Sequence, residues 1–179
     1  MNAVNYKELK INEIDEALFT GFDRYQEVTR CWRKEKGEWI LKDIPFIEQW
    51  NPEEYNRLIT HLQNTIKAGG AVFGAFLDDV LIGFTSVEND LLGSHKEYLQ
   101  LSELHISNGY RGLGIGKKLF SLICGQAKEM GAGKLYISAH SSQETQAFYQ
   151  AMGCVEAAEY NDSLVAKEPY DCQLEYSLY

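Results

Sequence analysis

Three glycines at alternate positions, Gly112, Gly114 and Gly116, stand where a predicted strand over residues 98–106 leads into a predicted helix over residues 113–130. Such a run leaves the backbone without Cβ atoms just where the first N–H groups of the helix lack intrahelical partners and carry the positive end of its dipole. A phosphate can approach these donors closely. The run therefore predicts an anion site at a strand–helix junction, although glycines alone could also form a flexible turn without a ligand.

Two common phosphate-binding motifs do not fit this turn. A dinucleotide fingerprint needs glycine at position 117, which is lysine. A P-loop needs glycine at position 111 and serine or threonine at position 118, and the chain has Arg111 and Lys118 there. Arg111 could instead add a charge-assisted contact to the anion.

The hydrophobic pattern around the turn predicts a mixed α/β sheet. Asn51 and Pro52 begin a helix that Gly69 and Gly70 end, and a capping box at Ser141-x-x-Glu144 begins another that ends at Gly153. Residues 43–50 are expected to form an aromatic-rich loop. The predicted strands are 4–10, 22–33, 38–42, 71–77, 80–87, 98–106, 134–139, 154–159 and 171–178, and the helices are 51–68, 113–130 and 141–152.

Composition predicts a single globular domain. The chain has 179 residues, of which 45% are hydrophobic and 12% aromatic. No signal peptide or membrane span is expected, because the longest apolar segment, residues 71–84, contains Asp78 and Asp79. Four cysteines without ligand spacing predict reduced thiols, no metal site and a cytoplasmic location. A net charge of −9 argues against a nucleic-acid partner.

Two segments resemble the GNAT superfamily of acetyl-CoA-dependent acyltransferases. The first is LHISNGYRGLGIG at residues 104–116, in which Arg111, Gly114 and Gly116 match the signature Arg/Gln-x-x-Gly-x-Gly/Ala. The second is TQAFYQAMGC at residues 145–154, which resembles the family helix Ala-x-x-Phe-Tyr-x-x-x-Gly-Phe. The resemblance covers about residues 70–178. The chain departs from the pattern where Ser142 replaces asparagine, Thr145 replaces alanine and Cys154 replaces phenylalanine.

The resemblance implies a fold, a cosubstrate and its contacts. The fold is a mainly antiparallel twisted sheet with two splayed parallel central strands, here 98–106 and 134–139, flanked by helices. Residues 1–179 would form one acetyltransferase domain, with an acceptor-binding part at about 1–70 and an acetyl-CoA-binding core at about 71–179. The pantetheine arm would pair with the backbone of residues 104–106 like an added strand. The implied coenzyme-binding residues are Leu104, His105, Ile106, Arg111, Gly112, Leu113, Gly114, Ile115, Gly116, Ser142, Thr145 and Tyr149.

Acetyl transfer to an amine needs a base for the ammonium and an acid for the leaving thiolate. By resemblance, Tyr149 points at the coenzyme sulfur and is the candidate acid. Along the strand at 98–106, a period of two places Leu99, Leu101, Glu103 and His105 on one face and Ser102, Leu104 and Ile106 on the other.

Glu103 and His105 would therefore lie about 7 Å apart and act jointly as the base, unless that face simply ends at solvent. Glu88 and His140 are further candidates for the base. His61 is expected to be structural, and His95 is a loop residue.

The sequence thus predicts an N-acetyltransferase that moves an acetyl group from acetyl-CoA to a primary amine of a small molecule by direct transfer in a ternary complex. The alternatives are a protein N-terminal or lysine acetyltransferase and a non-catalytic acetyl-CoA-binding regulatory domain. A homodimer also fits the resemblance. In this family the N-terminal half sets acceptor specificity. The candidate walls of the acceptor pocket are Trp32, Arg33, Trp39, Phe46 and Trp50. Trp32 and Trp39 could instead form the core of a hairpin.

Overall fold

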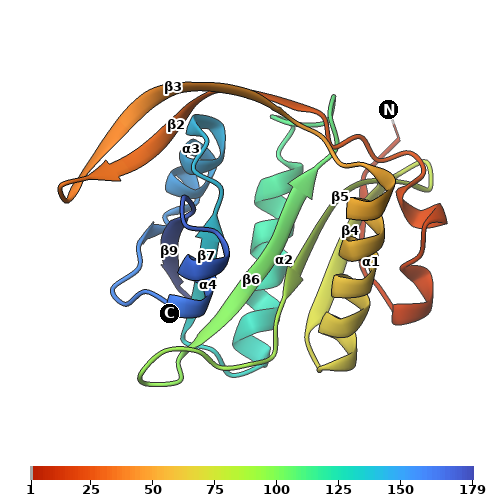
Figure 1. Cartoon of the computed structure of the whole chain (residues 1–179). Helices are drawn as coiled ribbons and strands as arrows, with labels where there is room; N and C mark the ends of the chain where they lie inside the picture. The colour runs from red at the N-terminus through yellow and green to blue at the C-terminus, as the bar shows by residue number, and fades with distance from the viewer. Residues whose placement is uncertain (1) are drawn as a thin grey trace.

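The computed structural model describes residues 2–179, which form a mixed α/β domain around one large sheet (Figure 1). Within those residues the sheet has seven strands in the order β1-β4-β5-β6-β7-β9-β8. All neighbouring strands are antiparallel except β6 and β7, which are parallel. The predicted fold class is confirmed. The strands are β1 (Asn5–Glu8), β4 (Ala71–Leu77), β5 (Val80–Val87), β6 (Tyr98–Ile106), β7 (Lys134–Ala139), β8 (Val155–Glu156) and β9 (Cys172–Ser177).

Helices cover both faces of this sheet (Figure 1). Helix α1 (Pro52–Lys67) packs Leu62 against the face that carries Phe84, and α2 (Ile115–Glu129) packs Leu119 against the face that carries Ile82. The predicted start of α1 is confirmed, because the Asn51 side chain accepts a hydrogen bond from the Glu54 N–H. The remaining helical segments are η1 (Ile11–Glu13), η2 (Ala17–Phe19), α3 (Gln143–Met152) and α4 (Asp162–Lys167). No helix among the described residues is long and apolar enough to cross a membrane.

Strands β6 and β7 separate soon after they meet. They pair only where Tyr98–Gln100 lies beside Lys134–Tyr136. Beyond that point β6 stays paired with β5, and β7 stays paired with β9 through Ala139. The upper halves of β6 and β7 therefore face each other without sharing hydrogen bonds, as the resemblance implied.

A β-bulge at Ser102 corrects the predicted alternation along β6. Ser86 of β5 pairs with Glu103, and its neighbour Val87 pairs with Leu101, so Ser102 is an extra residue. The extra residue turns the side chains that follow it to the opposite face. Leu104 and Ile106 consequently pack against α2, on the same side as Leu99 and Leu101, and Glu103 and His105 face α1 instead.

The segment predicted as an aromatic loop at residues 43–50 is mostly a strand. Strands β2 (Gln26–Glu35) and β3 (Glu38–Glu48) form a separate two-stranded sheet, here called the arm. Pro45 is tolerated in β3 because it lies at the bulge where the pairing shifts between Val28 and Arg30. The arm extends across the open ends of β6 and β7 and over α3 (Figure 1).

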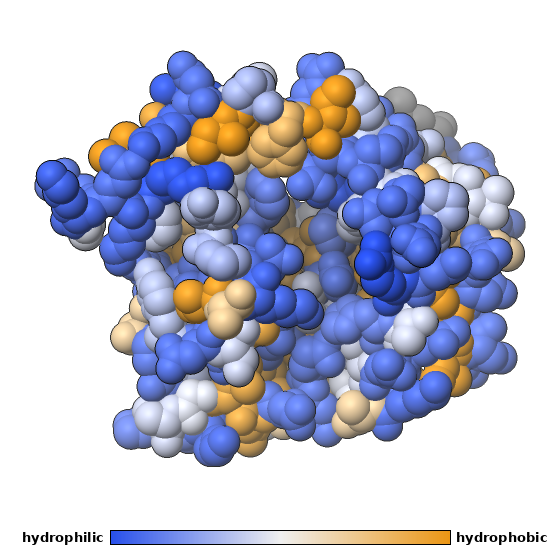
Figure 2. All heavy atoms as spheres, viewed as in Figure 1, coloured by the Kyte–Doolittle hydropathy of each residue, from blue (hydrophilic) through white to orange (hydrophobic). Residues whose placement is uncertain are grey.

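The arm is fixed to the start of α3 by backbone contacts. The Trp32 N–H donates to the Ser141 carbonyl at 2.8 Å, and Cys31 forms a β-bridge with Ser142. The space-filling view shows the surface hollowed beneath the arm (Figure 2).

Near the C-terminus, two local predictions need correction and one helix was not predicted. The residue that caps α3 is Ser142 rather than Ser141, since the Ser142 hydroxyl accepts from the Thr145 N–H at 3.2 Å. The strand predicted at 154–159 shortens to Val155–Glu156. Helix α4 was not predicted, because its six residues carry too short a pattern to show helical periodicity.

We expect Leu119→Ala to destabilise the fold by about 2–5 kcal/mol. Leu119 is fully buried under the junction of α2 with the sheet, and truncation would leave a cavity there. Denaturant unfolding with a linear extrapolation measures the change. Leu91→Ala is the matched control, because Leu91 is 39% exposed and its loss should cost under about 0.5 kcal/mol. Equal costs for the two variants would contradict this packing.

Candidate active site

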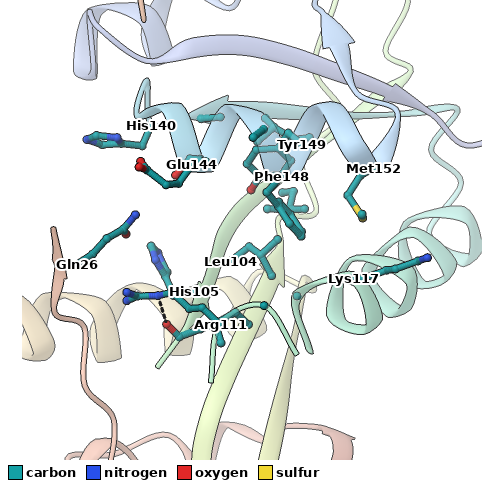
Figure 3. Close-up of a pocket in the computed structure, with 18 of the residues that line it drawn as sticks. Gln26, Leu104, His105, Arg111, Lys117, His140, Glu144, Phe148, Tyr149 and Met152 are labelled. Atoms are coloured by element: carbon teal, nitrogen blue, oxygen red, sulfur yellow. Dashed lines mark hydrogen bonds between the residues drawn. The ribbon is translucent and has the colours of Figure 1, made fainter. Parts of the chain in front are cut away.

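A cavity of about 630 Å³ occupies the gap between β6 and β7. Residues from both strands line it, together with the glycine turn, α3 and the segment that leads into the arm. Figure 3 shows Gln26, His140 and Glu144 on one side of the opening and Lys117 and Met152 farther along it. The cavity therefore joins the predicted phosphate site to the predicted acceptor region.

The glycine turn has the geometry that the sequence predicts for an anion site. Gly112 and Gly114 have φ values of +76° and +83°, which residues with a side chain rarely adopt. Gly114 is the N-cap of α2, and a Cβ at either position would meet no atom within 4 Å. Both glycines line the cavity, and the first N–H groups of α2 follow directly.

Gly116 serves a different purpose from the first two glycines. A Cβ at Gly116 would lie 3.1 Å from the Phe148 ring, so glycine here lets α2 and α3 approach closely. Leu113 and Ile115 do not line the cavity, because Leu113 is 68% exposed and Ile115 is buried in the core. Any contact from these two residues to a phosphate would come from their backbone.

Arg111 lines the cavity, and its guanidinium is engaged by the backbone around it. Its guanidinium donates to three backbone carbonyls, those of Ile106 at 3.1 Å, Tyr25 at 2.8 Å and Arg24 at 3.3 Å. Arg111 therefore ties the turn to the segment that precedes the arm. Lys117, in the first turn of α2, also lines the cavity (Figure 3).

The predicted pantetheine edge lies on the cavity wall. Leu104, His105 and Ile106 line it from β6, with residues 137–139 of β7 opposite. Thr145 also lines the cavity. Ser142 does not, because it is buried and its hydroxyl is used within the α3 cap, where it donates to Thr145 Oγ1 at 2.8 Å.

Tyr149 lies at the inner wall of the cavity with its hydroxyl unused. The residue is 6% exposed, and among residues 2–179 its hydroxyl has no hydrogen-bond partner. Burial raises the pKa of Tyr149 above its ordinary value. The phenol is therefore protonated at neutral pH and can donate into the cavity.

Glu103 and His105 form the closest carboxylate–imidazole pair of the site. His105 Nε2 lies 2.6 Å from Glu103 Oε2. His105 lines the cavity and Glu103 does not, so the carboxylate supports the imidazole from behind. The edge of the His105 ring packs against Trp50, with ring centroids 4.9 Å apart.

His61 lies beside the Glu103–His105 pair, although the sequence predicts a structural role for it. Its Nε2 lies 3.4 Å from Glu88 Oε1 and 3.8 Å from Glu103 Oε1. Glu88 also accepts hydrogen bonds from Thr65 at 2.8 Å and Ser102 at 2.6 Å, so it is held within the protein. Two histidines and two carboxylates thus meet on the α1 face of the sheet.

His140 lies at the opposite side of the cavity from this group. Its Nδ1 accepts from the Ser142 N–H at 3.0 Å, which leaves Nε2, 3.7 Å from Glu48, to carry the proton. Burial lowers the pKa of His140 below its ordinary value, with Glu48 opposing the shift. His95 lies in the exposed loop before β6 and takes no part in the cavity.

Of the aromatic residues proposed as acceptor walls, Trp50 is closest to the candidate base. The Phe46 and His140 ring centroids lie 5.6 Å apart, which places Phe46 near the cavity mouth. Trp32 and Trp39 pack against the core cluster below the arm and do not line the cavity.

Arg33 is occupied outside the cavity. It donates to Ser141 Oγ at 2.7 Å, and its guanidinium carbon lies 4.2 Å from the Tyr170 ring centroid.

Sequence reasoning missed Arg24, Gln26 and Ser138, all of which line the cavity. Arg24 and Gln26 lie at the entry to the arm, inside the strand predicted at residues 22–33, and no motif marks them as site residues. Among the described residues, no group of three or more His, Cys, Asp or Glu side chains is arranged to hold a metal ion.

Comparison with known proteins identifies the family of the chain. The sequence model of the Acetyltransferase (GNAT) family matches residues 25–154. No curated protein sequence matches the chain. Nourseothricin acetyltransferase superposes with a TM-score of 0.68 at 17% identity, covering 99% of each chain.

Two further solved structures have the same fold. A Bacillus anthracis protein described as a streptothricin acetyltransferase, solved with acetyl coenzyme A, has a TM-score of 0.69 at 17% identity over 97% of this chain and 95% of its own. An aminoglycoside 6'-N-acetyltransferase, solved with coenzyme A, has a TM-score of 0.55 at 11% identity over 73% of this chain and 82% of its own.

The family match spans the arm, the splayed strands, the glycine turn and α3, which together enclose the cavity. It confirms the resemblance and the assignment as an acyltransferase that uses acetyl-CoA. The chain belongs to the GNAT family of acetyltransferases.

Proposed function

We propose that this protein transfers an acetyl group from acetyl-CoA directly to a primary amine of a small molecule, with both substrates bound in the cavity between β6 and β7. The observation that carries the proposal is the unpartnered hydroxyl of Tyr149, a largely buried residue on the wall of a cavity that begins at the glycine turn. Acceptors named for two structural neighbours, streptothricin and aminoglycosides, are amine-bearing small molecules.

The donor would bind along the open edge of β6. Its pyrophosphate would rest on the N–H groups at the start of α2, which Gly112 and Gly114 leave accessible. Its pantetheine arm would pair with the edge of residues 104–106 that β7 leaves open, where the Ile106 carbonyl already accepts from Arg111. Lys117 adds a positive charge at the phosphate end.

Chemistry would take place between Tyr149 and His105. His105, held by Glu103, accepts the proton that the acceptor ammonium must lose, and the resulting amine attacks the thioester carbonyl. As the carbon–sulfur bond breaks, Tyr149 donates its proton to the departing thiolate, and the second proton lost by the nitrogen returns to the tyrosinate that remains. His105 then releases its proton to solvent. The products are an amide and free coenzyme A.

The arm favours a small acceptor over a protein. It lies over α3 and is fastened there by the Trp32–Ser141 backbone hydrogen bond. A protein substrate would need an open groove at this side of the cavity, and the arm covers it.

We expect Gly114→Asp to weaken acetyl-CoA binding by roughly 100-fold, because a carboxylate at the N-terminus of α2 repels the pyrophosphate. Isothermal titration calorimetry measures the affinity. Gly109→Asp is the matched control, since Gly109 also has a positive φ of +86° and open space around it but precedes the turn. Unchanged affinity in Gly114→Asp would show that the phosphates bind elsewhere.

We expect Tyr149→Phe to lower kcat by roughly 100-fold, because the thiolate loses its proton donor. The dissociation constant of acetyl-CoA should change by less than about threefold, since the ring and its packing remain. Thiol release at saturating acetyl-CoA gives kcat. Wild-type turnover in this variant would remove Tyr149 from the mechanism.

We expect His105→Gln to lower kcat by roughly 100-fold or more, because the amine loses its proton acceptor. Glu103→Gln should lower kcat as well, since the amide cannot stabilise the imidazolium that forms. Both are measured by thiol release with one acceptor, and His95→Gln, in the exposed loop, is the control. If His105→Gln keeps full activity, the base lies elsewhere in the site.

A further inference from the structure

Arg24 is a buried guanidinium on the wall of the cavity. It lies just before β2, is 9% exposed, and lines the cavity beside Gln26 and His105. Burial lowers the pKa of Arg24, and Glu48 opposes that shift. Because arginine keeps its charge in proteins, the cavity wall carries a fixed cation at this point.

The hydrogen-bond donors of Arg24 are largely unused. Nη1 donates to Gln26 Oε1 at 3.0 Å. Nη2 is 4.0 Å from Glu48 Oε2, which is too far for a hydrogen bond. Nε is the only buried side-chain nitrogen or oxygen among residues 2–179 that has no partner. A guanidinium has five N–H donors, so most of this group awaits an acceptor.

The surroundings hold Arg24 next to the candidate base. Its guanidinium carbon lies 5.3 Å from the Trp50 ring centroid. The His105 ring packs in a T-shaped arrangement against the same indole, with ring centroids 4.9 Å apart, and Phe22 stacks on Trp50 at 6.3 Å. One fixed aromatic ring therefore places the cation and the imidazole side by side at the acceptor end of the cavity.

We propose that Arg24 binds a carboxylate of the acceptor, so that the substrate is a small zwitterion: an amino acid or a derivative that keeps a carboxylate close to its reacting amine. The inference rests on the proposed function and specifies its acceptor. A planar guanidinium fork matches the two oxygens of a carboxylate, and it repels an acceptor that carries only positive charge. The ammonium end would face His105 and Glu103.

Glu48 does not act as the carboxylate partner of Arg24 within the protein. Its carboxylate is shared between Arg24 at 4.0 Å and His140 Nε2 at 3.7 Å, and it hydrogen-bonds to neither. It partly balances the Arg24 charge while the site is empty, and leaves the guanidinium donors available to a ligand.

The test compares acceptors that differ only in the carboxylate. L-leucine is paired with isoamylamine, L-phenylalanine with phenethylamine, and L-lysine with cadaverine, and thiol release gives kcat/KM for each. We expect at least one amino acid to exceed its amine by roughly 10- to 100-fold. In Arg24→Gln that ratio should fall to about one, and in Arg24→Lys to an intermediate value, because the charge remains without the fork.

Arg30→Gln is the control variant. Arg30 lies in the same strand region but pairs with exposed Asp43 at 3.2 Å and does not line the cavity, so the ratio should match wild type. A merely structural role for Arg24 would lower both members of a pair equally and leave the ratio unchanged. The inference is overturned if Arg24→Gln leaves the ratio unchanged, or if the wild-type protein prefers the amine in every pair.

The inference and the proposed function fail in different ways. If no amine causes thiol release, the proposed function fails, and the inference is then judged by calorimetric titration of the same pairs into the coenzyme A complex. Binding of an amino acid that is at least about tenfold tighter than that of its amine, and is lost in Arg24→Gln, supports it. Equal binding of all pairs to wild type and variant overturns it.

Discussion

The cavity exists because β6 and β7 stop sharing backbone hydrogen bonds after three residue pairs. Backbone N–H and C=O groups left without partners inside a protein are costly, so an open strand edge at the centre of a sheet is unusual. Here the edge lines a cavity that can admit an extended ligand. The glycine turn lies directly beyond the open edge of β6, so the proposed phosphate site and the proposed pantetheine-binding edge form one continuous path.

The bulge at Ser102 distributes the side chains of β6 between two tasks. Leu99 and Leu101 before the bulge, and Leu104 and Ile106 after it, pack against α2 and hold the strand in the core. The extra residue turns Glu103 and His105 towards α1, where His61 and Glu88 complete a polar group. A regular strand would have sent these two side chains into the apolar contact with α2, at a large desolvation cost.

Much of the site follows from local patterns in the chain. The glycines at 112 and 114 need positive φ and open space, which are properties that residue type and spacing alone convey. Tyr149 was located by its place in a helix motif. The alternation along β6 predicted the pairing of Glu103 with His105 but assigned the wrong neighbours, because a bulge depends on the partner strand and leaves no mark in the sequence.

The sequence by itself determined the family, most of the elements of the large sheet and the glycine turn, since these depend on residues adjacent in the chain. Only the tertiary structure decided what surrounds His105 and Glu103. Arg24 precedes the arm, Trp50 follows it, and His61 lies on α1, yet all three approach His105 or Glu103. Their contacts join segments that are tens of residues apart, and such long-range proximity arises from packing that no local pattern records.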